Sequence, residues 1–336
     1  MYEDFYGLRE RPFDLTPNPR FMYLSGCHLE ALSVVHYGIV SRKGITLVIG
    51  EAGTGKTTVV RAALEAIAQP SATCVYLSNP TLTRAEFYEF LAISFGLTTQ
   101  AAASKARFLL EFEQVLASRH HAGMLTALVI DEAQSLSLEL MEEVRLLANF
   151  ETASDRLLPV VMAGQPELAD TLDRPELRQL KQRVALRADL SPLGLNQTAA
   201  YVAGRLRKAG GDPLAVFTKD AIVRIYKRSG GIPRTISVVC DNAMLAGYAA
   251  AVKPIGPDIV EDVARDFRLG GNGAAHDFRS RDSDVGGGNG NHPHRRSDGG
   301  RSEGKESERP WKLNTEHVDA SPDAPASPAA PKGWLR

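Results

Sequence analysis

One segment governs the interpretation of this sequence: Gly50-Glu51-Ala52-Gly53-Thr54-Gly55-Lys56-Thr57. It matches G-x-x-x-x-G-K-[ST], a loop whose backbone amides cradle phosphate groups. A short β-branched run at 45–49 precedes it, and residues 58–67 follow with helical spacing of apolar side chains. This strand, loop and helix context favours a phosphate-binding P-loop over a glycine-rich turn in which Lys56 is merely solvated.

The P-loop interpretation assigns a role to each part of the segment. Lys56 is expected to reach the β- and γ-phosphates, and the Thr57 hydroxyl to ligate Mg²⁺. The helix that follows adds a favourable partial positive charge at its N-terminus. The expected cofactors are therefore ATP and Mg²⁺. The predicted nucleotide-binding residues are Gly50, Glu51, Ala52, Gly53, Thr54, Gly55, Lys56, Thr57 and Thr58.

Composition places the chain among soluble globular proteins. Its 336 residues leave room for about two domains, and 43% are hydrophobic and 24% charged. A net charge of −1 gives no bulk basicity that would favour nucleic acid. The longest apolar run, 243–252, is too short to cross a bilayer. The start of the sequence carries Glu3 and Asp4 and no apolar h-region, so we expect no signal peptide. We expect a cytoplasmic protein that can reach the inner membrane only through partners. Its three dispersed cysteines are expected to be reduced.

Residues 1–42 form a lead-in segment that is expected to pack on the domain after it. Apolar groups gather near its start, and a helix is predicted from about 28 to 40. The early aromatic residues have two open interpretations, since they either pack on the core or wall a pocket for adenine. The clustered residues are Tyr2, Phe5, Tyr6, Leu8, Pro12 and Phe13.

Residues 43–190 alternate between strand and helix, which predicts a parallel sheet with crossover helices and thus an α/β fold. Strands are expected at 45–49, 74–78, 127–131, 159–163 and 185–190. Helices are expected near 57–68, 83–96, 104–121, 137–149 and 174–183. Nucleotides in such sheets bind beyond the carboxyl ends of the strands.

Candidate catalytic groups lie close to those strands. The apolar strand 127–131 ends in Asp131, which is placed to hold Mg²⁺, and is followed by Glu132, which is placed to orient the attacking water. Gln165 follows the fourth strand and either contacts the γ-phosphate or caps a turn. Arg183 precedes the last strand and is either a finger for a neighbour's nucleotide or an exposed cation at a helix end.

Residues 191–269 contain no predicted strand and read as four helices, near 198–209, 218–229, 233–250 and 257–267. Pro233 would start the third of these, with Arg234 one residue in, where the helix dipole disfavours a cation unless a phosphate binds nearby. Residues 270–336 are rich in Gly, Ser, Asp, Pro and Ala, and we expect them to be disordered.

Together these motifs resemble an AAA+ ATPase, and more narrowly the general secretion pathway protein A (ExeA-type) family. The resemblance covers about residues 1–268. The segments that carry it are 5–8, 12–13, 17–19, 50–57, 131–134, 164–168, 180–183 and 231–234. It implies strand order 5-1-4-3-2, a helical lid, Gln165 as sensor 1, Arg183 as finger and Arg234 as sensor 2. It also implies ATP hydrolysis coupled to remodelling by a homo-oligomer.

The secretion members of this family continue into a membrane-spanning helix and a periplasmic peptidoglycan-binding domain, whereas from this sequence we expect neither. The architecture is expected to resemble soluble ATPases that accompany exopolysaccharide export and sorting. Two alternatives stay open: a DNA-dependent ATPase switch of the transposition type, and a P-loop small-molecule kinase. The helical segment with Arg234 and the acidic pair Asp131-Glu132 argue against the kinase.

Overall fold

The computed structural model describes residues 1–14, 19–67 and 72–269, which all belong to one compact unit. The predicted disorder of 270–336 therefore lies outside the described residues. The centre of the unit is a five-stranded parallel sheet of order β2-β3-β4-β1-β5. Its strands are β1 (Ile45–Gly50), β2 (Ala72–Leu77), β3 (Leu125–Ile130), β4 (Val160–Gly164) and β5 (Val184–Leu190). The predicted strand order is confirmed.

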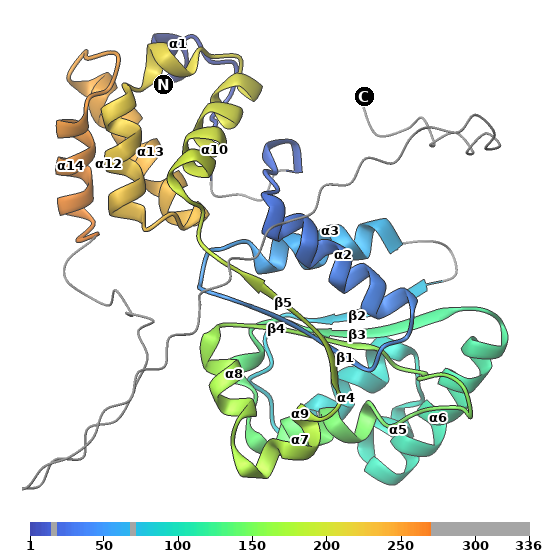
Figure 1. Ribbon diagram of the computed structural model, residues 1–336. Helices are drawn as coiled ribbons and strands as arrows, with labels where there is room; N and C mark the ends of the chain where they lie inside the picture. Colours follow the sequence, from blue (N-terminus) through green and yellow to red (C-terminus); the bar gives the residue numbers. More distant parts are fainter. Residues whose placement is uncertain (15–18, 68–71, 270–336) are drawn as a thin grey trace, which may run out of the picture. The chain divides into compact units, whose positions relative to one another are not determined.

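Helices cover both faces of the sheet (Figure 1). One face carries α2 (Gly26–Val40) and α3 (Lys56–Ile67). The other face packs against α4 (Arg84–Phe95), α6 (Lys105–His121) and α7 (Leu138–Leu147). Short helices complete this side: α5 (Thr99–Ala103), η2 (Ala133–Ser135), α8 (Pro166–Leu172), η3 (Pro175–Leu177) and α9 (Arg178–Lys181).

Burial on both faces explains the continuous apolar strands. Every residue of β1 and β4 is buried, as a central parallel strand covered by helices requires. β2 and β5, the two edge strands, have partly exposed patterns. This arrangement leaves only the carboxyl ends of the strands open for polar chemistry.

The region after the sheet is helical. It contains α10 (Leu195–Lys208), α11 (Pro213–Val216), α12 (Lys219–Ser229), α13 (Pro233–Ala249) and α14 (Pro257–Asp266). Side chains of α10, α12, α13 and α14 share a hydrophobic cluster separate from the two at the sheet. Within the described residues, no helix is both long and apolar enough to cross a membrane.

The lead-in segment packs differently from our prediction. Its start, with α1 (Glu3–Tyr6) and η1 (Pro19–Phe21), joins the hydrophobic cluster of the C-terminal helices through five side chains: Tyr2, Tyr6, Leu8, Phe13 and Phe21. The Tyr6 hydroxyl also donates to the Met244 carbonyl at 3.0 Å. Only α2 lies on the sheet, so the prediction that residues 1–42 pack on the sheet domain is wrong for their first half.

Two helix predictions also need correction. α8 was not predicted, because Pro166 after Gly164-Gln165 suggests a turn, whereas proline in fact occupies the first position of this helix. The helix expected near 174–183 is instead a 3₁₀ turn followed by the four-residue α9, which ends at Lys181. Arg183 therefore lies beyond any helix.

Candidate functional site

The P-loop connects β1 to α3 and is shaped by glycines. Gly53 (φ 81°) and Gly55 (φ 104°) adopt left-handed backbone that side chains rarely tolerate. A Cβ at Gly55 would meet His28 Nε2 at 3.1 Å. Thr54 closes the loop on itself, since its hydroxyl donates to the Glu51 carbonyl at 2.8 Å. The predicted loop therefore takes the tight form that backbone approach to a phosphate needs.

Lys56 is buried at the first turn of α3. Its ammonium donates to the carbonyls of Gly50 at 2.8 Å and Glu51 at 3.1 Å. Burial lowers the pKa of Lys56, while the negative charges of Glu132 and Asp131 act in the opposite direction. A cation held inside a loop of backbone amides suits an anionic ligand such as a phosphate group.

Asp131 follows β3 and joins the sheet to the P-loop. Its Oδ2 accepts hydrogen bonds from the Thr57 hydroxyl at 2.7 Å and from the Tyr76 hydroxyl at 2.5 Å. Burial, then the hydrogen bond and charge of Asp131, raise the pKa of Tyr76, so its phenol stays a donor. Hydroxyl and carboxylate oxygens are the hard ligands that Mg²⁺ prefers, so the donor set of Thr57 and Asp131 fits the expected metal.

Glu132 has a left-handed backbone (φ 51°), uncommon for a non-glycine residue and often found at functional sites. Its Oε2 accepts from Gln134 Nε2 at 2.6 Å and from Gln165 Nε2 at 3.5 Å. The structure thus brings Glu132 and Gln165 together. Gln165 precedes α8, but its side chain forms no cap there, so the turn-capping alternative is wrong.

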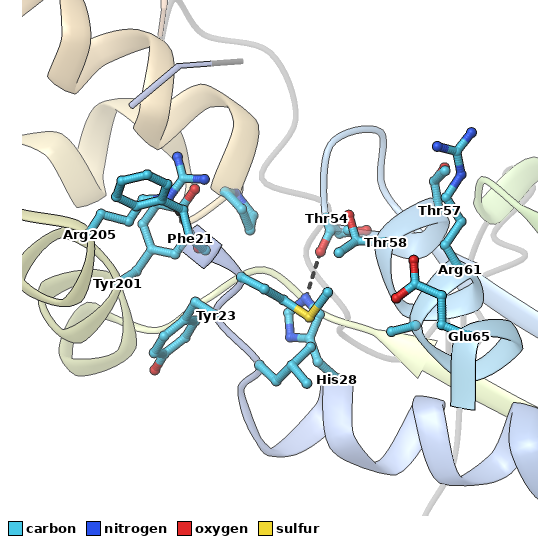
Figure 2. Close-up of a pocket in the computed structure, with 15 residues that line it drawn as sticks. Phe21, Tyr23, His28, Thr54, Thr57, Thr58, Arg61, Glu65, Tyr201 and Arg205 are labelled. Carbon is cyan, nitrogen blue, oxygen red and sulfur yellow. Dashed lines mark hydrogen bonds between the residues drawn. The ribbon is translucent and has the colours of Figure 1, made fainter. Parts of the chain in front are cut away.

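A cavity of about 330 Å³ opens beside the P-loop and α3. Figure 2 shows Phe21, Tyr201 and Arg205 on one side of it and Thr58, Arg61 and Glu65 on the other. The remaining lining residues are Met22, Tyr23, Leu24, His28, Thr54, Gly55, Thr57, Ala62 and Pro233. An aromatic and apolar cavity of this volume fits a nucleoside.

Of the two interpretations of the early aromatic cluster, packing is correct. None of its six residues lines the cavity, whereas the adjoining segment Phe21–Leu24 does. Arg205 stabilises this wall, because its guanidinium lies over the rings of Tyr201 and Phe21 at 5.1 and 5.5 Å.

Arg234 lies beside the P-loop, at the start of α13. Its backbone amide donates to the Gly53 carbonyl at 3.3 Å, and a Cβ on Gly53 would meet Arg234 Cβ at 2.9 Å. The side chain is exposed and makes no ion pair with any described residue. The C-terminal helices therefore bring an unneutralised guanidinium to the loop.

Arg183 lies at the amino ends of the strands, whereas the P-loop lies at their carboxyl ends. Its carbonyl accepts from the amide of Ile45, the first residue of β1, whereas the P-loop begins at Gly50, the last residue. The five residue steps of strand between Ile45 and Gly50 separate them by about 17 Å. Arg183 is thus too far away to contact a nucleotide on its own P-loop.

Sequence reasoning missed several residues of the site. His28 is buried on α2, where its Nδ1 is hydrogen-bonded to Ser25 Oγ at 2.6 Å and its Nε2 donates to the Thr54 carbonyl at 2.8 Å (dashed in Figure 2). Tyr76 reaches Asp131 from the end of β2. Gln134 holds Glu132 from η2. Of these residues, only Tyr76 could have been found from the sequence, because it lies near the end of a predicted strand. The contacts of His28 and Gln134 depend on tertiary packing.

Comparisons with known proteins agree with this geometry. A family profile described as an AAA domain matches residues 39–172. General secretion pathway protein A of Aeromonas hydrophila is 41% identical over 251 residues, which cover 74% of this chain and 45% of that protein. The chain thus spans about half the length of this curated relative.

Solved structures show the same fold at low identity. The Aeropyrum pernix ORC2 protein in its ADPNP-ADP complexes superposes with a TM-score of 0.56 at 15% identity, over 76% of this chain and 71% of that one. Drosophila ORC bound to DNA gives 0.58 at 20% identity, over 76% and 64%. The chain thus has the fold of AAA+ P-loop proteins, contains a segment that matches the AAA domain, and is similar over about three quarters of its length to general secretion pathway protein A.

Proposed function

We propose that this protein is a Mg²⁺-dependent ATP hydrolase. The observation that carries the proposal is the 2.7 Å hydrogen bond from Thr57 to Asp131, which joins the P-loop to the end of β3. Lys56 precedes Thr57 in the chain and Glu132 follows Asp131, so both flank the residues of this junction in sequence. A phosphate-binding cation, a pair of metal ligands and a general base thereby converge on one point at the carboxyl edge of the sheet.

Each residue then has a distinct role. Lys56 binds the β- and γ-phosphates by exchanging its two backbone carbonyl partners for phosphate oxygens. Thr57 and Asp131 hold Mg²⁺, which when bound neutralises charge on the phosphate oxygens. Glu132 orients the attacking water and accepts its proton. Gln165, in the turn after β4, and Arg234, at the start of α13, contact the γ-phosphate.

We also propose how hydrolysis is transmitted. Residues 43–190 act as the ATPase domain and 191–269 as a lid. The lid touches the P-loop directly, through the Arg234 amide and the Gly53 carbonyl. A ligand that binds both Lys56 and Arg234 favours the closed arrangement of the two, and its hydrolysis removes that preference. Closure is therefore coupled to the presence of the γ-phosphate.

The proposed biological setting is based on the similarity to general secretion pathway protein A. The name of that relative supports a role for this chain in an envelope secretion or polysaccharide-export apparatus. The distance of Arg183 from its own P-loop supports action as a homo-oligomer, in which Arg183 serves the nucleotide of an adjacent protomer. In this setting the assembled ring remodels a protein component of the apparatus.

The test compares Lys56→Ala with Lys219→Ala, an exposed lysine at the start of α12. Lys56→Ala removes the main cation for the phosphates, so nucleotide affinity and phosphate release are both expected to be lost. Lys219→Ala should match the wild type. Titration with a fluorescent ATP analogue and a phosphate-release assay measure the two quantities. Wild-type protein that binds no nucleotide, or Lys56→Ala that still turns over, would refute the proposal.

A further inference from the structure

The amide of Gln134 bridges two elements of the site. From η2 its Nε2 donates to Glu132 Oε2 at 2.6 Å, and its Oε1 accepts from the Gln165 backbone amide at 3.0 Å. The end of β3 and the turn after β4 are thus connected through one side chain. Its orientation is fixed by these partners, because a flipped amide would face a donor with a donor and an acceptor with an acceptor.

Space for this bridge depends on Gly164. A Cβ there would meet Gln134 Oε1 at 3.0 Å and Leu168 Cδ2 at 2.7 Å, and Cβ atoms in proteins essentially never come as close as the second. Any side chain at position 164 would therefore displace its neighbours. The end of β4 accordingly leaves room for the amide of a residue 30 positions earlier in the chain.

The bridge fixes one carboxylate oxygen of Glu132 and leaves the other free to accept a hydrogen bond from water. Oε2 accepts from both Gln134 and Gln165, whereas Oε1 accepts no hydrogen bond from any described residue. A general base needs a free carboxylate oxygen for its water and a fixed orientation for the rest of the group. The two glutamine amides provide the second requirement without interfering with the first.

We propose that Gln134 is a positioning residue for ATP hydrolysis: it fixes the Glu132 carboxylate and ties it to the Gln165 turn. This inference rests on the proposed function and adds to it a residue outside the P-loop and the acidic pair. Gln134 touches neither phosphate nor metal in this role. Its loss should therefore lower kcat and leave nucleotide affinity unchanged, because misplacing a reacting group by about 1 Å costs about 10²-fold in rate.

Two substitutions separate positioning from mere bracing of the loop. Gln134→Met keeps the length of the side chain and removes both hydrogen bonds. Gln134→Glu keeps an acceptor for the Gln165 amide but replaces the donor to Glu132 with a like charge. Gln114→Met, at an exposed position of α6, is the matched control. Phosphate release, ATP-analogue affinity and melting temperature are measured for the full chain in each case.

We expect both Gln134 variants to lose about 10²-fold in kcat, with affinity within about twofold of the wild type, while Gln114→Met matches the wild type. A Gln134→Glu protein with normal kcat would overturn the inference, since bracing of Gln165 would then suffice. Normal kcat in Gln134→Met would overturn it as well. If Gln134→Met does not fold, Gln134→Glu carries the test alone. If the wild type and Gln114→Met also release no phosphate, the proposed function itself has failed.

Discussion

At the scale of single residues, the site depends on which donors share the Asp131 carboxylate. Thr57 and Tyr76 both donate to Oδ2, so a metal that binds this oxygen must compete with the phenol. Tyr76→Phe removes one competitor. A hydrogen bond to a charged group contributes about 1.5–3 kcal/mol, so we expect the Mg²⁺ concentration for half-maximal binding of an ATP analogue to fall by about tenfold.

The control for this substitution is Tyr37→Phe on α2, a residue that is 51% exposed. It should leave the Mg²⁺ requirement unchanged. If Tyr76→Phe instead needs a higher Mg²⁺ concentration for half-maximal binding, the phenol positions Asp131 for the metal and does not compete with it. Titration of Mg²⁺ against analogue fluorescence distinguishes these results without relying on turnover.

At the scale of elements, a buried ion cluster holds together three helices below the sheet. Glu143 on α7 is 1% exposed and accepts from Lys105 on α6 at 2.7 and 2.9 Å, and from Arg84 and Tyr88 on α4. Burial alone would raise the pKa of Glu143, but the hydrogen bonds from Lys105 and Tyr88 and the charges of Lys105 and Arg84 lower it below its ordinary 4.5.

Glu143→Gln should therefore destabilise the fold, because Arg84 and Lys105 lose the charge of a carboxylate that is only 1% exposed. Both cations are partly exposed and screened by solvent, so we expect a loss of about 1 kcal/mol, below that of a fully buried pair. Glu139→Gln, which removes an exposed neighbour that also contacts Arg84, should change the unfolding free energy little. Urea denaturation measures the unfolding free energy of both variants. Equal losses would show that Glu143 stabilises the fold no more than its exposed neighbour does.

The same cluster sets a pH dependence. A carboxyl whose pKa is lower in the folded state stabilises the fold above its unfolded pKa, and this stabilisation is lost as the pH falls. The wild type should thus lose stability as pH decreases below about 4.5, and Glu143→Gln should lose less over that range. Parallel losses in the two proteins would contradict this assignment.

The elements also show how far the sequence could be interpreted. The bounds of all five strands were predicted to within two residues from the β-branched runs, the P-loop and Asp131-Glu132. This was possible because the hydrophobic pattern of a strand and the motif at its end are properties of the local sequence. The early aromatic residues could not be placed, since Tyr2 and Tyr6 pack on helices more than 200 residues away. The role of Gln134 could not be predicted either, because it depends on a contact with Gln165, in the turn after β4.

At the scale of the whole molecule, the position of Arg183 predicts that hydrolysis requires assembly. Arg183→Ala should bind ATP normally but hydrolyse it at least about 10³-fold more slowly. Mixing it with Lys56→Ala should restore some turnover, because an intact P-loop on one chain can then face an intact Arg183 on the other. Arg207→Ala, at an exposed position of α10, should behave as the wild type. No recovery on mixing, with a specific activity independent of protein concentration, would remove Arg183 from the catalytic residues and make Arg178 the next to test.

The central claim is that Glu132 activates water while Lys56, Thr57 and Asp131 hold the nucleotide. The nucleotide content of Glu132→Gln tests it most directly. After incubation with ATP and Mg²⁺ and removal of free nucleotide, the account predicts that this variant retains ATP, whereas the wild type retains ADP or none. ADP in the variant at the wild-type level would show that Glu132 is not the base. Absence of any bound nucleotide in the variant would show that binding and catalysis are not divided between these residues.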